Sequence, residues 1–150
     1  MKKDQTELEK RVWQRVKGES PLPQPERELA ALLAGEAACW AVCGALSRRT
    51  EGKNGSKLRQ IAEEAQENLA CLKGMYLLTT GHMPVVHPTQ PSREPVLPAL
   101  QGQCRRELQL LQQYTLRAGD PECGPVFAGL AQRKREHCTA LLQILGSRKE

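Results

Sequence analysis

Residues 120–145, DPECGPVFAGLAQRKREHCTALLQIL, decide the fold class of this chain. The stretch opens with a turn rich in proline, glycine and aspartate and continues as a helix pattern. Apolar residues then recur every three or four positions, which predicts an amphipathic helix from about Pro125 to Leu145. The apolar stripe of that helix carries Lys134 and His137 in its middle, where charged side chains are rarely buried.

Three further stretches show the same helical period. They run from about Pro25 to Arg49, from about Lys57 to Thr80 and from about Ala99 to Ala118. The first two are separated by TEGKNGSK, which predicts a turn, with Ser56 as the N-cap of the second helix. We therefore expect an all-α fold of four long helices.

The connection between the second and third helices is long and proline-rich. Residues 82–98, HMPVVHPTQPSREPVLP, cannot form a helix, because proline lacks the backbone donor and clashes with the preceding turn. A connection of this length can travel along a whole bundle, whereas the other two loops are short. The loop lengths predict an up-down-down-up four-helix bundle with one long crossover.

A short amphipathic segment precedes the bundle. Leu8, Val12, Trp13 and Val16 fall on one side of a helix pattern from Asp4 to Lys17, which the proline stretch after it ends. We expect residues 1–24 to form an N-terminal amphipathic helix and linker, and residues 25–150 to form the bundle. The helix could dock onto a protein partner or onto a second copy in a homodimer.

The charge, hydropathy and cysteine positions of the chain argue against several classes of function. The net charge of +5 comes from short basic clusters mixed with acids, without a DNA-reading motif or an aromatic platform, so nucleic-acid binding is not favoured. No apolar run of about 18 residues and no signal-peptide core is evident, which favours a cytoplasmic protein without a membrane span. Five of the six cysteines fall in helix patterns, which predicts reduced core residues.

Each helix pattern is apolar at both ends of its inward stripe and polar or undersized in the middle. The middle positions are Glu36 on the first helix, Ala65 and Asn68 on the second, Glu107 on the third, and Lys134 and His137 on the fourth. Buried charges must be paired or must bind a metal, because removing each one from water costs several kcal/mol. We expect these positions to meet in the core.

The stretch from about Pro25 to Leu145 resembles the rubrerythrin-like branch of the ferritin-like superfamily. IAEEAQENLACLKGMYLLTTG, residues 61–81, is similar to the second helix of that family, and residues 120–145 are similar to its fourth. The resemblance implies a di-metal site with six ligand positions. Glu36, Glu107 and His137 keep a family ligand type, whereas Ala65, Asn68 and Lys134 are altered ligand positions.

These departures argue against a di-iron centre, which needs several anionic oxygens. Two interpretations remain open. In the metal-free one, Glu36 and Glu107 are neutralised by Lys134 and a protonated His137. In the other, Glu36, Glu107 and His137 hold one divalent ion, Fe, Mn or Zn, with Glu64 or Asn68 as a further ligand.

The cysteines add one more hypothesis. Cys39 and Cys104 lie one turn from Glu36 and Glu107, so they could form a thiol pair beside the polar residues, or they could be small residues that ease helix packing. The sequence favours a non-catalytic ferritin-like protein with a degenerate site. The alternatives are an iron-dependent peroxide-reducing or ferroxidase protein with a remodelled site and, more weakly, a basic DNA-associated bundle.

Overall fold

The described residues of the computed structural model form four helices and no strand. The structure describes residues 24–87, 89–90 and 93–148, and the all-α class is confirmed there. The helices are α2 (Gln24–Arg48), α3 (Gly52–Thr80), α4 (Val96–Arg117) and α5 (Gly124–Ser147). The N-terminal helix expected over Asp4–Lys17 lies outside the described residues.

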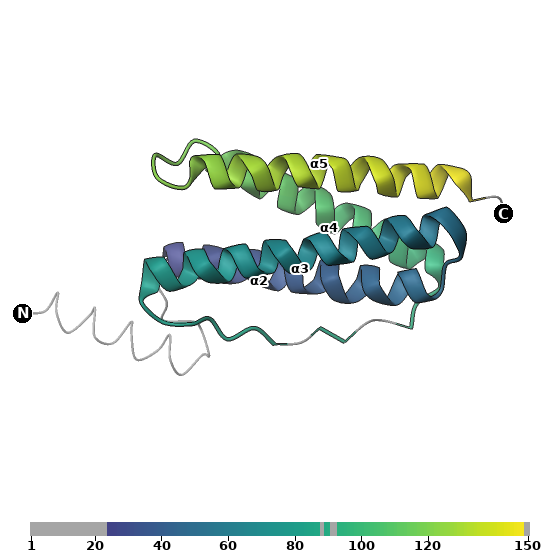
Figure 1. The fold of residues 1–150 in the computed structure, drawn as a ribbon, viewed down its shortest axis with the longest axis horizontal. Coiled ribbons are helices and arrows are strands. Elements are labelled where there is room, and N and C mark those ends of the chain that lie inside the picture. Colours follow the sequence, from purple (N-terminus) through teal and green to yellow (C-terminus); the bar gives the residue numbers. More distant parts are fainter. Residues whose placement is uncertain (1–23, 88, 91–92, 149–150) are drawn as a thin grey trace, which may run out of the picture.

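The four helices pack as two hairpins. α2 packs against α3, α4 packs against α5, and the hairpins meet through α2 with α4 and α3 with α5. Figure 1 shows that the segment after α3 runs along the bundle and reaches the end where α3 began. α4 therefore starts beside the α2–α3 turn and runs back along the bundle.

The α2–α3 connection is shorter than the sequence indicated. The expectation of a turn over TEGKNGSK, capped by Ser56, is wrong, because α3 already begins at Gly52 with Glu51 as its N-cap. Gly52 has φ +70°, which reverses the chain within very few residues. A Cβ on Gly55 would lie 2.1 Å from the Thr50 carbonyl oxygen, so glycine there lets the first turn of α3 close onto the connection.

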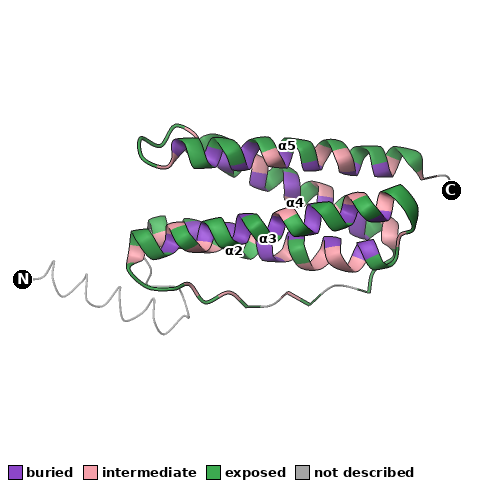
Figure 2. Ribbon diagram, in the orientation of Figure 1, coloured by how far each residue is buried: buried purple, intermediate pink, exposed green. Residues whose placement is uncertain are grey.

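The core is divided into two apolar halves. One cluster fills the end that holds Leu33, Leu72 and Phe127, and the other fills the end that holds Leu46 and Ile144. Figure 2 shows buried positions spaced along the inner side of each helix. On α4 and α5 the buried polar residues lie between the two clusters along the sequence, whereas Glu36 on α2 and Asn68 on α3 lie within the first cluster, near its inner end. The bundle thus encloses a polar layer at mid-length.

The spacing predicts an inward stripe of α4 through Leu100, Cys104, Glu107, Leu111 and Tyr114, and the structure differs at two of these positions. Gln103 and Leu110 are buried, whereas Cys104 and Leu111 are only half-buried. Both alternatives satisfy the three- and four-residue spacing of a helix stripe. The buried register is possible because Gln103 donates a hydrogen bond to Glu107, which satisfies its amide inside the core.

One helix in the described part of the chain, over Pro25–Arg48, is long and apolar enough by length and composition to cross a membrane. The sequence reasoning did not single out this stretch, because Glu36 interrupts its apolar residues. The signal is weak, since a core helix passes the same test, and α2 is packed against α3 and α4 here.

Candidate functional site

The polar layer consists of six buried side chains. They are Glu36 on α2, Asn68 on α3, Gln103 and Glu107 on α4, and Lys134 and His137 on α5. The Nζ of Lys134 lies 2.7 Å from Oε1 of Glu36 and 3.0 Å from Oε2 of Glu107. All three side chains are 0% exposed. One ammonium therefore bridges two carboxylates that come from different helices.

His137 lies between two further carboxylate oxygens. Its Nε2 is 2.8 Å from Oε1 of Glu64, and its Nδ1 is 3.4 Å from Oε2 of Glu107. An ionised carboxylate only accepts hydrogen bonds, so both ring nitrogens must carry protons to donate to both acids. His137 thus links Glu64 of α3 to Glu107 of α4 through its two ring nitrogens.

Neutral groups complete the hydrogen bonding of both central carboxylates. The Tyr114 hydroxyl donates to Oε2 of Glu36, and the Asn68 amide lies 3.4 Å and 3.5 Å from the two oxygens of Glu36. Arg133, near the surface, donates to Oδ1 of Asn68 at 3.0 Å. No polar side-chain atom of the layer is both buried and unpartnered. Full pairing of this kind makes a buried ionic cluster tolerable.

In the polar layer, charges and hydrogen bonds from neighbouring side chains outweigh the effect of burial on the pKa values of Glu107 and Lys134. Burial alone would raise the pKa of Glu107, but the hydrogen bond from His137 and the charge of Lys134 outweigh it and lower the pKa to about 2. Burial alone would lower the pKa of Lys134, but the neighbouring acidic groups Cys39, Glu36 and Glu107 raise it above its ordinary value. Both groups are therefore charged at neutral pH.

The low pKa of Glu107 predicts a loss of stability in acid. A carboxyl whose pKa falls from 4.5 to about 2 on folding stabilises the fold above pH 4.5, and this contribution is lost as the pH falls to about 2. At about 1.4 kcal/mol per pH unit, it amounts to about 3 kcal/mol. Urea unfolding between pH 6 and pH 2 measures it.

The matched variants for this titration are Glu107→Gln and Glu136→Gln. Glu136 is exposed on α5, so its replacement should leave the pH profile unchanged. Glu107→Gln should flatten the profile between pH 4.5 and pH 2. An equally steep profile in both variants would show that Glu107 does not carry the acid dependence.

The structure brings the sequence-selected positions together. Glu36, Glu107 and His137, together with the altered positions Asn68 and Lys134, all belong to the polar layer. Ala65 is also fully buried, although it belongs to the apolar cluster at one end of the core. That these positions serve as metal ligands stays a prediction of the resemblance.

The residues present do not fit a di-iron centre. Lys134 reaches the two carboxylates that would have to bridge or bind the metal ions, and its ammonium lies between their oxygens. A cation in the same place would face the repulsion of this charge. The described ranges also contain no group of three or more His, Cys, Asp or Glu side chains arranged to hold a metal ion.

Sequence reasoning missed Gln103, and it placed Tyr114 on the inward stripe of its helix without a role in the site. Gln103 lies one turn before Glu107, and Tyr114 lies two turns after it, on the same face of α4. The spacing from Glu107 was a usable signal for both. Glu64 was placed only at the edge of its stripe, and the structure shows that it reaches His137.

The structure contains both cysteines of the proposed thiol pair as free thiols. Cys39 is fully buried, and its Sγ is 3.8 Å from the Nζ of Lys134, whereas Cys104 is only half-buried. Burial is the main cause that raises the pKa of Cys39 and of Cys104, which makes both thiols poor nucleophiles. A disulfide between them stays a prediction.

Comparisons with known proteins add no family to this description. The chain matches no protein-family model, no curated protein and no solved structure.

Proposed function

We propose that the chain is a ferritin-like, rubrerythrin-like protein in which an internal ion-pair cluster replaces the di-metal site, so that the bundle is a non-catalytic scaffold. The carrying observation is the position of Lys134, whose ammonium lies within 3.0 Å of both Glu36 and Glu107. A single covalently attached cation there supplies the charge compensation that buried carboxylates require.

The arrangement of the helices supports the family part of the proposal. α2 and α3 form one hairpin, α4 and α5 form the other, and one long connection joins them along the bundle (Figure 1). A ferritin-like bundle has one long crossover in an up-down-down-up order, so this arrangement supports the proposal. The polar layer at mid-length is also where such bundles build their metal sites, from side chains on facing helices.

The charges of the polar layer support the proposal that it contains no metal ion. Glu36 and Glu107 contribute two negative charges, and Lys134 and the imidazolium of His137 contribute two positive charges. The outer acid, Glu64, is only part-buried and faces solvent on one side. The interior is therefore neutral without a metal ion. A single-metal site or an iron-dependent peroxide reductase would require Lys134 to leave both carboxylates.

A scaffold of this kind acts through its surface in the cytoplasm. The proposal assigns no substrate and places its contacts with other proteins on the outer faces of the helices. Six free cysteines, none of them in a disulfide, fit a reducing compartment.

Metal content tests the proposal directly. Protein purified without chelators is assayed by elemental analysis, before and after anaerobic incubation with Fe²⁺ and gel filtration. We expect less than about one tenth of an iron per chain, because the ammonium of Lys134 excludes a second cation from the carboxylates. Far-UV circular dichroism of the same sample should show an intact helical protein.

Higher metal contents would overturn specific parts of the proposal. About one ion per chain, lost in the His137→Ala variant, would establish a single-metal site with Lys134 turned away. About two irons per chain would restore a di-iron enzyme. The exposed histidines His82 and His87 provide the control, because replacing both should remove only metal bound at the surface.

A further inference from the structure

The first helix of the bundle, α2, has no charged outer face along most of its length. Between Leu29 and Ser47 the only carboxylate or basic side chain is Glu36, and that residue is fully buried. A helix that is apolar all round is normally covered all round. Yet only 44% of the most apolar window of α2 is buried, and Trp40 is 43% exposed. Part of the surface of α2 therefore lacks a cover.

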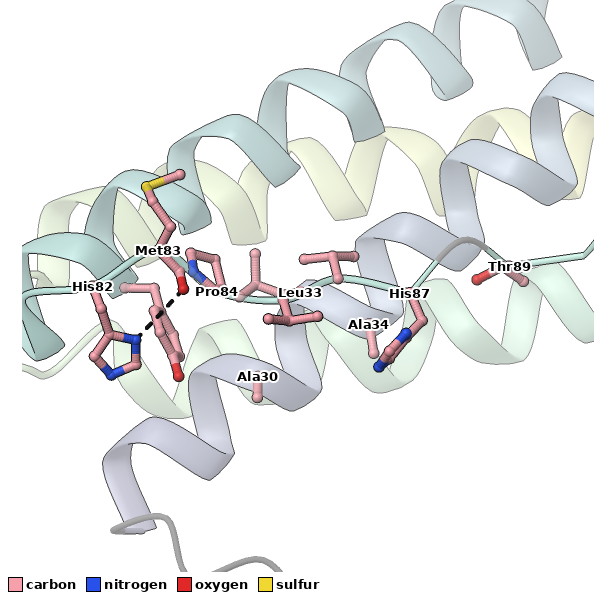
Figure 3. Close-up of a pocket in the computed structure, with 11 residues that line it drawn as sticks. Ala30, Leu33, Ala34, His82, Met83, Pro84, His87 and Thr89 are labelled. Atoms are coloured by element: carbon pink, nitrogen blue, oxygen red, sulfur yellow. Dashed lines mark hydrogen bonds between the residues drawn. The ribbon is translucent and has the colours of Figure 1, made fainter.

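The uncovered surface is a groove beside the long connection. Two adjoining pockets of about 420 Å³ and 480 Å³ follow α2 and share Val86, His87 and Thr89 as one wall. Figure 3 shows Ala30, Leu33 and Ala34 of α2 opposite the segment from His82 to Thr89. We call this surface the α2 groove. Its α2 side, lined by Ala30, Leu33, Ala34, Ala37, Trp40 and Gly44, is apolar along its length.

We propose that residues 4–17 of the same chain occupy the α2 groove, with Leu8, Val12, Trp13 and Val16 against it. The length matches, because 14 helical residues span about 21 Å, which is also the distance along α2 from Ala30 to Gly44. The segment is joined to Gln24 by six residues, 18–23. These can extend to about 20 Å, which is enough to turn back and lie antiparallel to α2.

Charge complementarity supports the same orientation. The first half of the segment, residues 4–9, contains three acids and no base, whereas residues 10–17 contain four bases and no acid. The far end of the α2 groove is rimmed by Arg48 and Lys73. The near end begins at the acidic first turn of α2, which contains Glu26. An antiparallel segment therefore places opposite charges together at both ends.

Covalent attachment favours this occupant over a second copy of the chain. A segment tethered by a short linker has a local concentration in the millimolar range, well above the concentration of other copies in a dilute sample. It also hides two apolar surfaces at once, its own stripe and the α2 groove.

The fluorescence of Trp40 can report whether residues 4–17 cover the α2 groove. The chain contains only two tryptophans, and replacing Trp13 with phenylalanine leaves Trp40 as the only one. In this full-length Trp13→Phe background, acrylamide quenching of Trp40 fluorescence is compared for Val12→Asp and Gln14→Asp. Val12 lies on the apolar stripe, and Gln14 lies on the opposite side of the helix pattern. We expect Val12→Asp to raise the quenching constant about twofold and Gln14→Asp to leave it unchanged, because only the former places a charge against the apolar groove and so releases the segment that covers Trp40.

A second variant on the apolar stripe and a measurement of the oligomeric state test the same proposal. Leu8→Asp, one turn earlier on the stripe, should give the same rise, while the circular dichroism of the bundle stays unchanged. Equal, strong quenching in all variants would show that the segment does not cover the groove. Protection that disappears on dilution, together with a dimer in sedimentation, would assign the groove to a second copy and overturn the proposal.

Discussion

Replacing Lys134 with methionine is expected to lower the free energy of unfolding by about 3 to 5 kcal/mol at neutral pH, as when one partner of a buried ion pair is removed. Methionine has a similar length but no charge. The ammonium that lies 2.7 Å from Glu36 and 3.0 Å from Glu107 is lost. Both carboxylates are fully buried, so neither regains its hydration. Urea denaturation followed by circular dichroism at pH 7 measures the loss.

The loss should depend on pH in a characteristic direction. Lys134 is one of the groups that hold the pKa of Glu107 below its ordinary value of 4.5, so without the ammonium the burial of this carboxyl raises its pKa in the folded variant. A carboxyl with a raised pKa destabilises the fold increasingly as the pH rises through that range. We therefore expect the difference between Lys134→Met and the wild-type protein to be largest at pH 7 and smaller near pH 4. A lost packing contact alone would give the same difference at both pH values.

Two variants control the interpretation. Arg135→Met removes a cation from the adjacent, exposed position of α5 and should change stability by less than about 0.5 kcal/mol. Adding Glu36→Gln to Lys134→Met should recover part of the loss, because it removes one of the two uncompensated charges. If Lys134→Met unfolds like the wild-type protein, the ion pair does not support the fold and the metal-free proposal fails.

The helices were predictable because their period is strong. The stripe of α5, Phe127, Leu130, Lys134, His137, Leu141 and Ile144, is buried at every position, as the sequence indicated. The flanking apolar residues determine which face turns inward, and the two polar residues follow them into the core. The start of α3 was not predictable from composition, because the glycines of TEGKNGSK indicate a turn while two of them in fact allow a tight helix start.

The partners within the site were less predictable than its members. A sequence pattern can place Glu36, Glu107 and Lys134 at one depth of the bundle, but it does not say which atoms meet. That outcome depends on side-chain reach across helices, as in the contact between Tyr114 and Glu36, which are 78 residues apart. The choice between Gln103 and Cys104 on α4 was ambiguous for a related reason. The polar choice is favourable because the Gln103 amide donates to Glu107 and its carbonyl oxygen accepts a hydrogen bond from Arg106.

Replacing Lys134 with glutamate is expected to create an affinity for one divalent metal ion per chain that the wild-type protein lacks. The change removes the ammonium and adds a carboxylate between Glu36 and Glu107, beside His137 and Glu64. Carboxylate and imidazole ligands then surround a position without a counter-ion. Only one ion is expected, because the altered positions Ala65 and Asn68 supply no carboxylate and Glu64 is the one acid of α3 that reaches the layer. Without metal, the variant should be destabilised by several kcal/mol through repulsion among buried acids.

Thermal melts with and without Mn²⁺ or Zn²⁺ measure this effect, since a ligand at 100 times its dissociation constant stabilises the folded state by about 2.7 kcal/mol. Lys134→Gln is the matched control: it removes the positive charge without adding a ligand, and should bind metal more weakly than Lys134→Glu. His137→Ala in the Lys134→Glu background should abolish the stabilisation if the metal lies in the polar layer. If Lys134→Glu gains no metal while remaining folded, the layer is not a former metal site, and the ferritin-like assignment loses its chemical support.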